Sequence, residues 1–62
     1  MYVKIIYREP ESNEFKWREY TQVLGILSTT DGISIEFYPN EYDVYLHRYI
    51  HRIEIKQEKP ET

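Results

Sequence analysis

The feature that most constrains this chain is the alternation of apolar and polar residues in short runs. This period of two is clearest over residues 2–8, 33–38 and 42–46, where β-branched and aromatic side chains predominate. Clusters of Pro, Asn, Asp and Gly lie between the runs, and these residue types favour turns. The pattern therefore predicts antiparallel strands that are joined by hairpins.

The stretch 14–28 is less regular than the rest. Gly25 lies inside an apolar run, which suggests a bulge or a sharp bend. The stretch predicts either one long bent strand or two strands that meet near Thr21 and Gln22. A helix over residues 14–24 is the competing interpretation, although it would give only a partly coherent apolar face.

The remaining signals complete an all-β interpretation. Asp31-Gly32 predicts a hairpin turn, because Gly accepts a positive φ without penalty. The period breaks after Leu46, where residues 47–50 fit one 3-10 turn before a last strand. We expect a single β domain over residues 1–56, built as a small five-stranded SH3-like barrel or a strongly bent antiparallel sheet, and a flexible polar tail over 57–62. The predicted core is the set of alternating apolar side chains Val3, Ile5, Tyr7, Phe15, Trp17, Val23, Ile26, Ile33, Ile35, Phe37, Val44, Leu46, Ile53 and Ile55.

The order of these elements resembles the small SH3-like barrels, whose final strand follows a 3-10 turn. The spacing of the later apolar residues also resembles that of short β-rich proteins from Gram-positive bacteria, their phages and plasmids. That resemblance is carried by Ile33-Ser34-Ile35-Glu36-Phe37, Tyr45-Leu46 and Ile50-His51-Arg52-Ile53-Glu54-Ile55. It implies an accessory factor that regulates or inhibits a larger enzyme.

Composition excludes several classes of function. The 62 residues contain no Cys, so neither a disulfide framework nor a thiolate metal site is expected. No apolar run approaches the ~20 residues of a membrane helix, and we expect a cytoplasmic protein. The sequence offers no nucleophile motif and no Gly-rich phosphate loop, so we expect no catalysis, no cofactor and no small-molecule substrate.

The seven tyrosines suggest a surface for protein recognition, because the core cannot absorb all of them. Alternation places Tyr38 and Tyr45 on the outer face of neighbouring strands, where Tyr20 and Tyr2 would join them. This face, or an exposed sheet edge, is the predicted contact with a protein partner or a second copy of the chain.

A second candidate is a basic and aromatic segment near the end of the chain. Residues 47–56 carry a net charge of +2, whereas residues 1–46 carry −4. Arginines would contact phosphates and a tyrosine would stack on a base, as in small barrels that bind single strands. The predicted nucleic-acid site is His47, Arg48, Tyr49, His51, Arg52 and Lys56.

Three further interpretations carry less weight. His47 and His51 have a spacing that suits zinc on a helix, but the arginines beside them would repel a cation. The carboxylates of the first hairpin could meet a basic partner, together with Glu36, Glu41 and Asp43. The chain could also be a structural subunit of a larger assembly.

Overall fold

The computed structural model describes residues 1–58 and is built entirely from short strands and one 3-10 turn. The predicted tail falls partly inside this range, and its residues 59–62 lie outside the described residues. The elements are β1 (Tyr2–Arg8), β2 (Phe15–Tyr20), β3 (Gly25–Ser28), β4 (Gly32–Tyr38), β5 (Glu41–Leu46), η1 (His47–Tyr49) and β6 (Ile50–Lys56).

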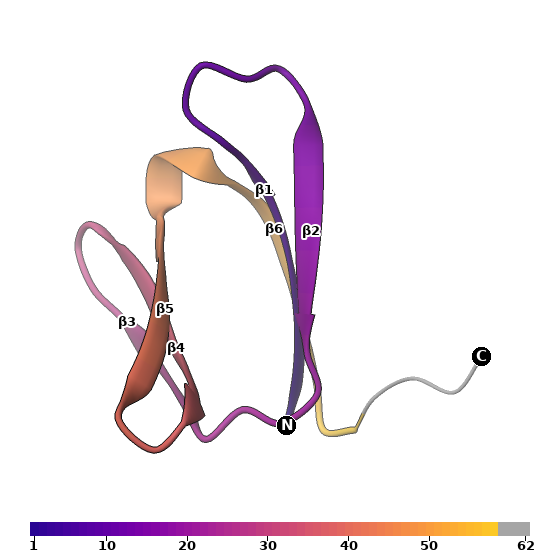
Figure 1. Cartoon of the computed structure of the whole chain (residues 1–62), viewed down its shortest axis with the longest axis vertical. Helices are drawn as coiled ribbons and strands as arrows, with labels where there is room; N and C mark the ends of the chain where they lie inside the picture. Colours follow the sequence, from indigo (N-terminus) through magenta and orange to yellow (C-terminus); the bar gives the residue numbers. More distant parts are fainter. Residues whose placement is uncertain (59–62) are drawn as a thin grey trace.

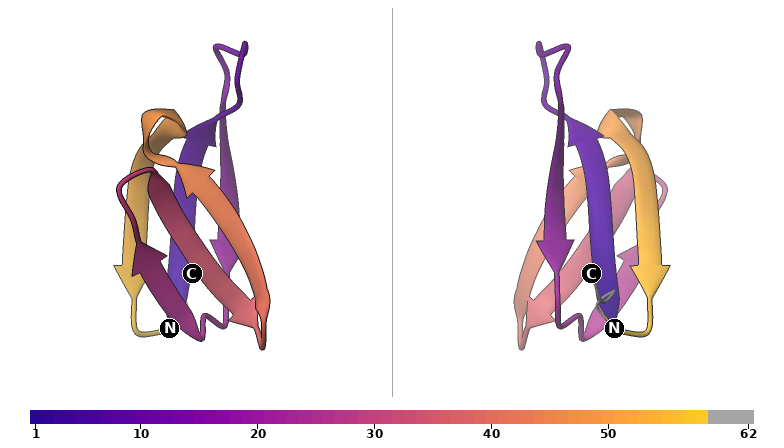
Figure 2. Two further views of the ribbon diagram at one scale, coloured as in Figure 1. Left: turned by 90° about the vertical axis from the view of Figure 1, so that its left-hand side faces the viewer. Right: turned by 90° about the vertical axis from the view of Figure 1, so that its right-hand side faces the viewer.

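The strands form two antiparallel sheets that lie face to face (Figures 1 and 2). Sheet A has the order β2-β1-β6, and sheet B has the order β3-β4-β5. The all-β class and the 3-10 turn before the last strand are thus confirmed. The structure has six strands where five were predicted. Among the described residues, the two sheets do not close into a barrel.

The connection between β2 and β3 explains the additional strand. Residues 21–24 leave the ladder of sheet A, and β3 then pairs with β4 in sheet B. The Val23 N–H donates to the Met1 carbonyl oxygen at 3.0 Å, and the Leu24 N–H donates to the Glu36 carbonyl oxygen at 2.8 Å. The connection is therefore bonded to both sheets, and the predicted break near Thr21 is confirmed. The helical alternative is wrong, because β2 pairs along its whole length with β1.

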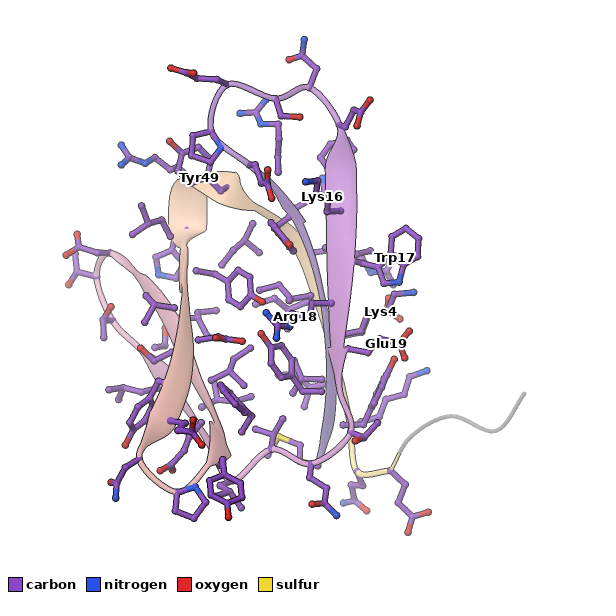
Figure 3. All side chains as sticks on the ribbon, in the orientation of Figure 1. Lys4, Lys16, Trp17, Arg18, Glu19 and Tyr49 are labelled. Atoms are coloured by element: carbon purple, nitrogen blue, oxygen red, sulfur yellow. The ribbon has the colours of Figure 1, made fainter. Side chains whose placement is uncertain are left out.

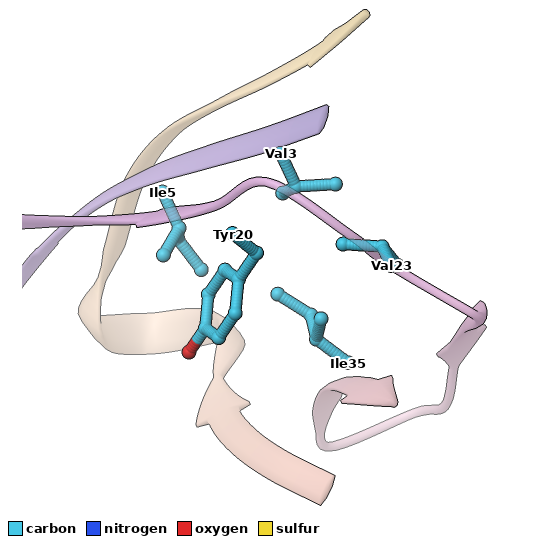
Figure 4. Packing of buried hydrophobic residues seen from close by; sticks show 5 residues of the cluster. All are labelled: Val3, Ile5, Tyr20, Val23 and Ile35. Atoms are coloured by element: carbon cyan, nitrogen blue, oxygen red, sulfur yellow. The ribbon is translucent and has the colours of Figure 1, made fainter. Parts of the chain in front are cut away.

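A small core fills the space between the sheets (Figure 4). Val3, Ile5 and Ile35 are fully buried, and Val23 and Tyr20 complete the cluster. Tyr7, Ile26, Ile33, Phe37, Tyr45, Ile50 and Ile53 pack against it while remaining partly exposed. The apolar alternation of β1 and β4 thus correctly predicted the centre of the core.

Five predicted core residues are exposed instead: Phe15, Trp17, Val44, Leu46 and Ile55. On β2 the register pairs Tyr20 with Val3, so Tyr20 faces sheet B, and alternation turns Phe15 and Trp17 outward. On β5 the register pairs Tyr45 with Ile33, which likewise turns Val44 and Leu46 outward. Ile55 pairs with Val3, but it lies on the edge strand β6 and stays 57% exposed.

Gly32 is required by a close approach of two backbones. No described glycine has a positive φ, so the reason given for Gly in the Asp-Gly turn is wrong. A Cβ on Gly32 would instead lie 2.2 Å from the Tyr45 carbonyl oxygen on the paired strand. The turn itself closes through the Thr29 N–H, which donates to the Gly32 carbonyl oxygen at 2.8 Å.

Candidate functional surfaces

The predicted tyrosine surface does not form. Tyr20 is only 6% exposed and packs in the core, which corrects its predicted place on an outer face. Tyr2 alternates with the buried Val3 and donates its hydroxyl to Glu19 on the outer side of sheet A, but it is only 4% exposed. Tyr45 is partly buried and packs against the core, so it also points inward. Tyr38 alone of the four is well exposed, at 62%. The structure brings together only Tyr20 and Tyr45, through their hydroxyl groups.

These two tyrosines belong to a polar cluster that ties β2 to β5. The Tyr20 hydroxyl donates to Asp43 Oδ2 at 2.6 Å and also shares a hydrogen bond with the Tyr45 hydroxyl. Arg18 Nη1 lies 3.4 Å from the same Asp43 oxygen, and its guanidinium lies 5.5 Å from the centre of the Tyr20 ring. The cluster therefore joins the two sheets beside the core.

Burial is the main cause of the electrostatics of this cluster. It raises the pKa of Tyr20 far above its usual value, and the hydrogen bonds to Asp43 and Tyr45 add to the effect. Burial also raises the pKa of Tyr45. Both hydroxyls therefore stay protonated at neutral pH, and they act as hydrogen-bond donors rather than as bases or nucleophiles.

The outer side of sheet B carries an apolar surface, which we call the apolar face and define as Leu27, Tyr42, Val44 and Leu46. Their side chains are 62%, 54%, 65% and 36% exposed. Leu27 and Val44 both pair with Ser34, one from each neighbouring strand. Residues that pair in this way across a sheet form a cross-strand row, and their side chains point to the same side. Because Ser34 is small, a shallow hollow of about 230 Å³ opens beside it, lined by Gly25, Ile26, Leu27, Ser34, Glu36 and Tyr42.

Charge separates the two sheets. Residues 20–46, which include all of sheet B, contain no Lys or Arg but contain Asp31, Glu36, Glu41 and Asp43. Every Lys and Arg of the described residues lies in or beside the strands of sheet A and in η1. The strands that carry the apolar face therefore contain carboxylates and no cation, while Arg8 and Arg48 of neighbouring segments line hollows beside Leu46.

The outer side of sheet A has a different character, and we call it the aromatic–basic face. Two of its cross-strand rows contain no carboxylate. In the first, Phe15 pairs with Arg8. In the second, Ile6 pairs with Trp17 on one side and with Arg52 on the other. Phe15 and Trp17 are 56% and 64% exposed. In Figure 3, Trp17 and Lys4 lie on the side of β2 that faces away from sheet B, whereas Arg18 lies between the sheets. The Lys4 ammonium lies 5.8 Å from the centre of the Trp17 ring.

The predicted nucleic-acid segment is divided between several places. The His51 ring lies 4.5 Å from the Phe15 ring, which places it at the edge of the aromatic–basic face. Arg48 and Tyr49 line a hollow of about 220 Å³ together with Arg8, Phe15, Ile50 and His51. Arg52 lies on this face, and Lys56 pairs with Tyr2 further along the same sheet.

His47 is separated from this group. Its Nε2 lies 2.8 Å from the Thr29 carbonyl oxygen, so in the Nε2-protonated tautomer it donates to the turn before β4. The rings of His47 and His51 thus contact different segments. Within residues 1–58, no group of three or more potential ligands is placed to hold a metal ion.

The sequence interpretation missed the exposed residues of both faces. Phe15, Trp17 and Val44 were assigned to the core because they are apolar and alternate with polar neighbours. The local pattern of β2 favoured this assignment, since its other side carries Lys16 and Arg18 together with Tyr20. Which set of alternate residues faces inward depends on contacts with strands that are distant in the sequence.

Comparisons with known proteins do not extend these observations. No family model matches the sequence, and no curated protein or solved structure shows significant similarity to it. Across the described part of the chain, no helix is both long and apolar enough to traverse a lipid bilayer.

Proposed function

We propose that this protein is a non-catalytic protein-binding module and that the apolar face of sheet B is its contact surface. The observation that carries this proposal is the exposure of Leu27, Tyr42 and Val44 side by side on one sheet. Contiguous exposed apolar side chains are uncommon on monomeric proteins and mark interaction surfaces. Burial of one such side chain contributes about 1.5–3 kcal/mol to association.

The charge around this face selects the kind of partner. Sheet B carries carboxylates and no cation, so it would repel a phosphate backbone. The hollow beside Ser34 is about 230 Å³, below the ~300 Å³ at which small-molecule sites begin. A protein surface with an apolar centre and a basic rim is complementary to both features.

The dimensions suit such a contact. The chain extends over 32 × 30 × 16 Å, and the outer side of each sheet spans the longest and the shortest of these dimensions (Figures 1 and 2). A standard interface needs about 800 Å² from each partner, so one sheet face suits a contact at the small end of the range. The free edges of β3 and β5 are a further means of attachment, because a partner strand can add to either.

We further infer that the fold is related to the small SH3-like barrels. What supports this is the way in which β2 and β3 pair with different sheets across four connecting residues, like two halves of one bent strand. A small accessory factor that binds and regulates a larger protein fits these properties, and a structural subunit of an assembly is the second candidate.

The test compares two double variants in an affinity capture from cell extract. Leu27→Thr/Val44→Thr removes apolar area from the face and places β-branched residues, which favour strands, at both positions. Phe15→Thr/Ile55→Thr makes a similar change at exposed positions of sheet A. A specific partner should bind the wild type and the sheet A variant, but bind the face variant at least about tenfold more weakly.

Equal capture by both double variants would contradict the proposal. Light scattering on the same three proteins detects self-association. A dimer that only the face variant loses would support the structural-subunit candidate instead.

A further inference from the structure

We propose that the aromatic–basic face of sheet A binds single-stranded nucleic acid, with bases stacked on Trp17 and Phe15 and phosphates held by Arg8, Arg52 and Lys4. This site lies on the other sheet from the apolar face and does not depend on the function proposed above. It also differs from the site predicted from the sequence, which included neither Phe15 nor Trp17.

The aromatic side chains are placed as a stacking platform. Trp17 and Phe15 are two residues apart on β2, so they point to the same side of the sheet. Two residues of a strand span about 6.6 Å, a separation that allows each ring to take a different base. Both rings are more than half exposed, with Lys4 over one face of Trp17 and the His51 ring beside Phe15, so a base would stack on the ring area that these neighbours leave open. Stacking of this kind tolerates any sequence, because every base has a π-face.

The positive side chains are placed where the backbone of such a strand would run. Arg8 and Arg52 lie in the same cross-strand rows as the two rings, and Lys4 lies in the next row. The first carboxylates across the sheet are Glu19 and Glu54, which flank Lys4 in that next row. The rows that contain the rings therefore present only positive charge to a phosphate.

The hollow beside η1 extends this surface. Its lining includes Arg8 and Phe15 from the face and Arg48 and His51 from the other side. A volume of about 220 Å³ is small for a ligand site but adequate for one phosphate group or the edge of one base. A strand that crosses the sheet thus meets a third arginine at its end.

The same features favour a single strand over other ligands. In a duplex the base faces are covered by stacking, so exposed rings on a sheet gain nothing from it. A protein partner would need a larger apolar centre than two rings separated by cations. The net charge of −3 is compatible with this proposal, because residues 20–46 contribute −4 and the rest of the chain contributes +1.

The test is a titration of labelled oligothymidine, about 12 nucleotides long, followed by fluorescence anisotropy between about 50 and 200 mM salt. We expect saturable binding that weakens as salt rises. Trp17→Ala should weaken it at least about fivefold, since stacking of one base contributes that much or more. Arg52→Ala should reduce the slope of log K against log salt by about 0.7, the value for one lost phosphate contact on a single strand.

Lys16→Ala is the matched control. It removes one positive charge, as Arg52→Ala does, but Lys16 lies on the side of β2 that faces sheet B, and its ammonium is paired with Glu9 at 2.9 Å. The control should bind as the wild type does, and so should Leu27→Thr/Val44→Thr. The proposal is overturned by a lack of saturable binding at the lowest salt, or by binding that Trp17→Ala leaves unchanged. Tighter binding of the matching duplex would also overturn it.

Discussion

Replacing Tyr20 with Phe should destabilise the fold by an amount that follows from one hydroxyl group. The ring keeps its place in the core, 6.1 Å from the Phe37 ring, so the change creates no cavity. The hydroxyl donates to the Asp43 carboxylate, and a hydrogen bond to a charged group contributes about 1.5–3 kcal/mol. We expect the free energy of unfolding to fall by about 2 kcal/mol, within this range, because Arg18 remains beside Asp43 and still compensates its charge.

That loss is large for this chain. A domain of this size has about 3–5 kcal/mol of total stability, so Tyr20→Phe should remove roughly half of it. Thermal unfolding followed by far-UV circular dichroism should show a decrease of about 10 °C in the midpoint. Tyr38→Phe is the control, since Tyr38 is 62% exposed and should unfold as the wild type does. A decrease below ~0.5 kcal/mol for Tyr20→Phe would refute the assigned role of the cluster.

The same cluster gives this prediction a pH dependence. An unfolded tyrosine loses its proton near a pKa of about 10, whereas burial raises the pKa of folded Tyr20 far above that value. Above pH ~10 the unfolded state therefore binds fewer protons than the folded state, and stability falls as pH rises. Tyr20 contributes at most about 1.4 kcal/mol per pH unit to this fall. Above pH ~10, the free energy of unfolding of Tyr20→Phe should therefore fall less steeply with pH than that of the wild type. An equal slope for the two proteins would contradict the mechanism.

Four other substitutions separate core, turn and surface effects, and urea unfolding measures each. Ile35→Ala should cost about 2–5 kcal/mol because Ile35 is fully buried, whereas Val44→Thr should change stability by less than ~0.5 kcal/mol because Val44 is 65% exposed. Equal effects would place Val44 in the core. Gly32→Ala should cost about 1–3 kcal/mol, because the new Cβ would clash with a backbone carbonyl, and a neutral result would refute that contact. Glu11→Gly should stabilise the chain by about 0.5–1 kcal/mol, because Glu11 has a φ of 66°, and a loss of stability would refute this assignment of strain.

Local sequence was sufficient to predict most of the fold. The alternation over β1 and β4 predicted strands with Val3, Ile5 and Ile35 on the buried side. In each of these strands, one set of alternate residues is more apolar than the other. Turn residues at Pro39-Asn40 predicted a hairpin, and Asn40 does adopt a positive φ of 63°. In these segments, local preference and long-range packing favour the same structure.

Which side of β2 and of β5 faces the core could not be predicted, because both sides of these strands contain aromatic residues. Tyr20 faces inward since its hydroxyl reaches Asp43, a residue 23 positions later in the chain. Asp43 and Tyr45 face inward on β5 for the same reason, and this reverses the prediction for Val44. A partly buried polar cluster thus selects the register, and no local pattern contains that information. The exposure of Phe15, Trp17 and Val44 could not be predicted for the same reason, because this cluster orients the strands that carry them.

The distribution of apolar residues gives the physical reason to assign functions to both outer faces. Ten large hydrophobic side chains are exposed among the described residues, whereas only six hydrophobic residues are buried. Two three-stranded sheets enclose a small volume, so outward apolar residues contribute little to folding. On open-edged sheets they also promote aggregation, which charged residues at the same positions would prevent. Such side chains are therefore a liability to the isolated chain. The two proposed contacts would remove that liability, since a partner protein would cover Leu27 and Val44, and the bases of a single strand would cover Trp17 and Phe15.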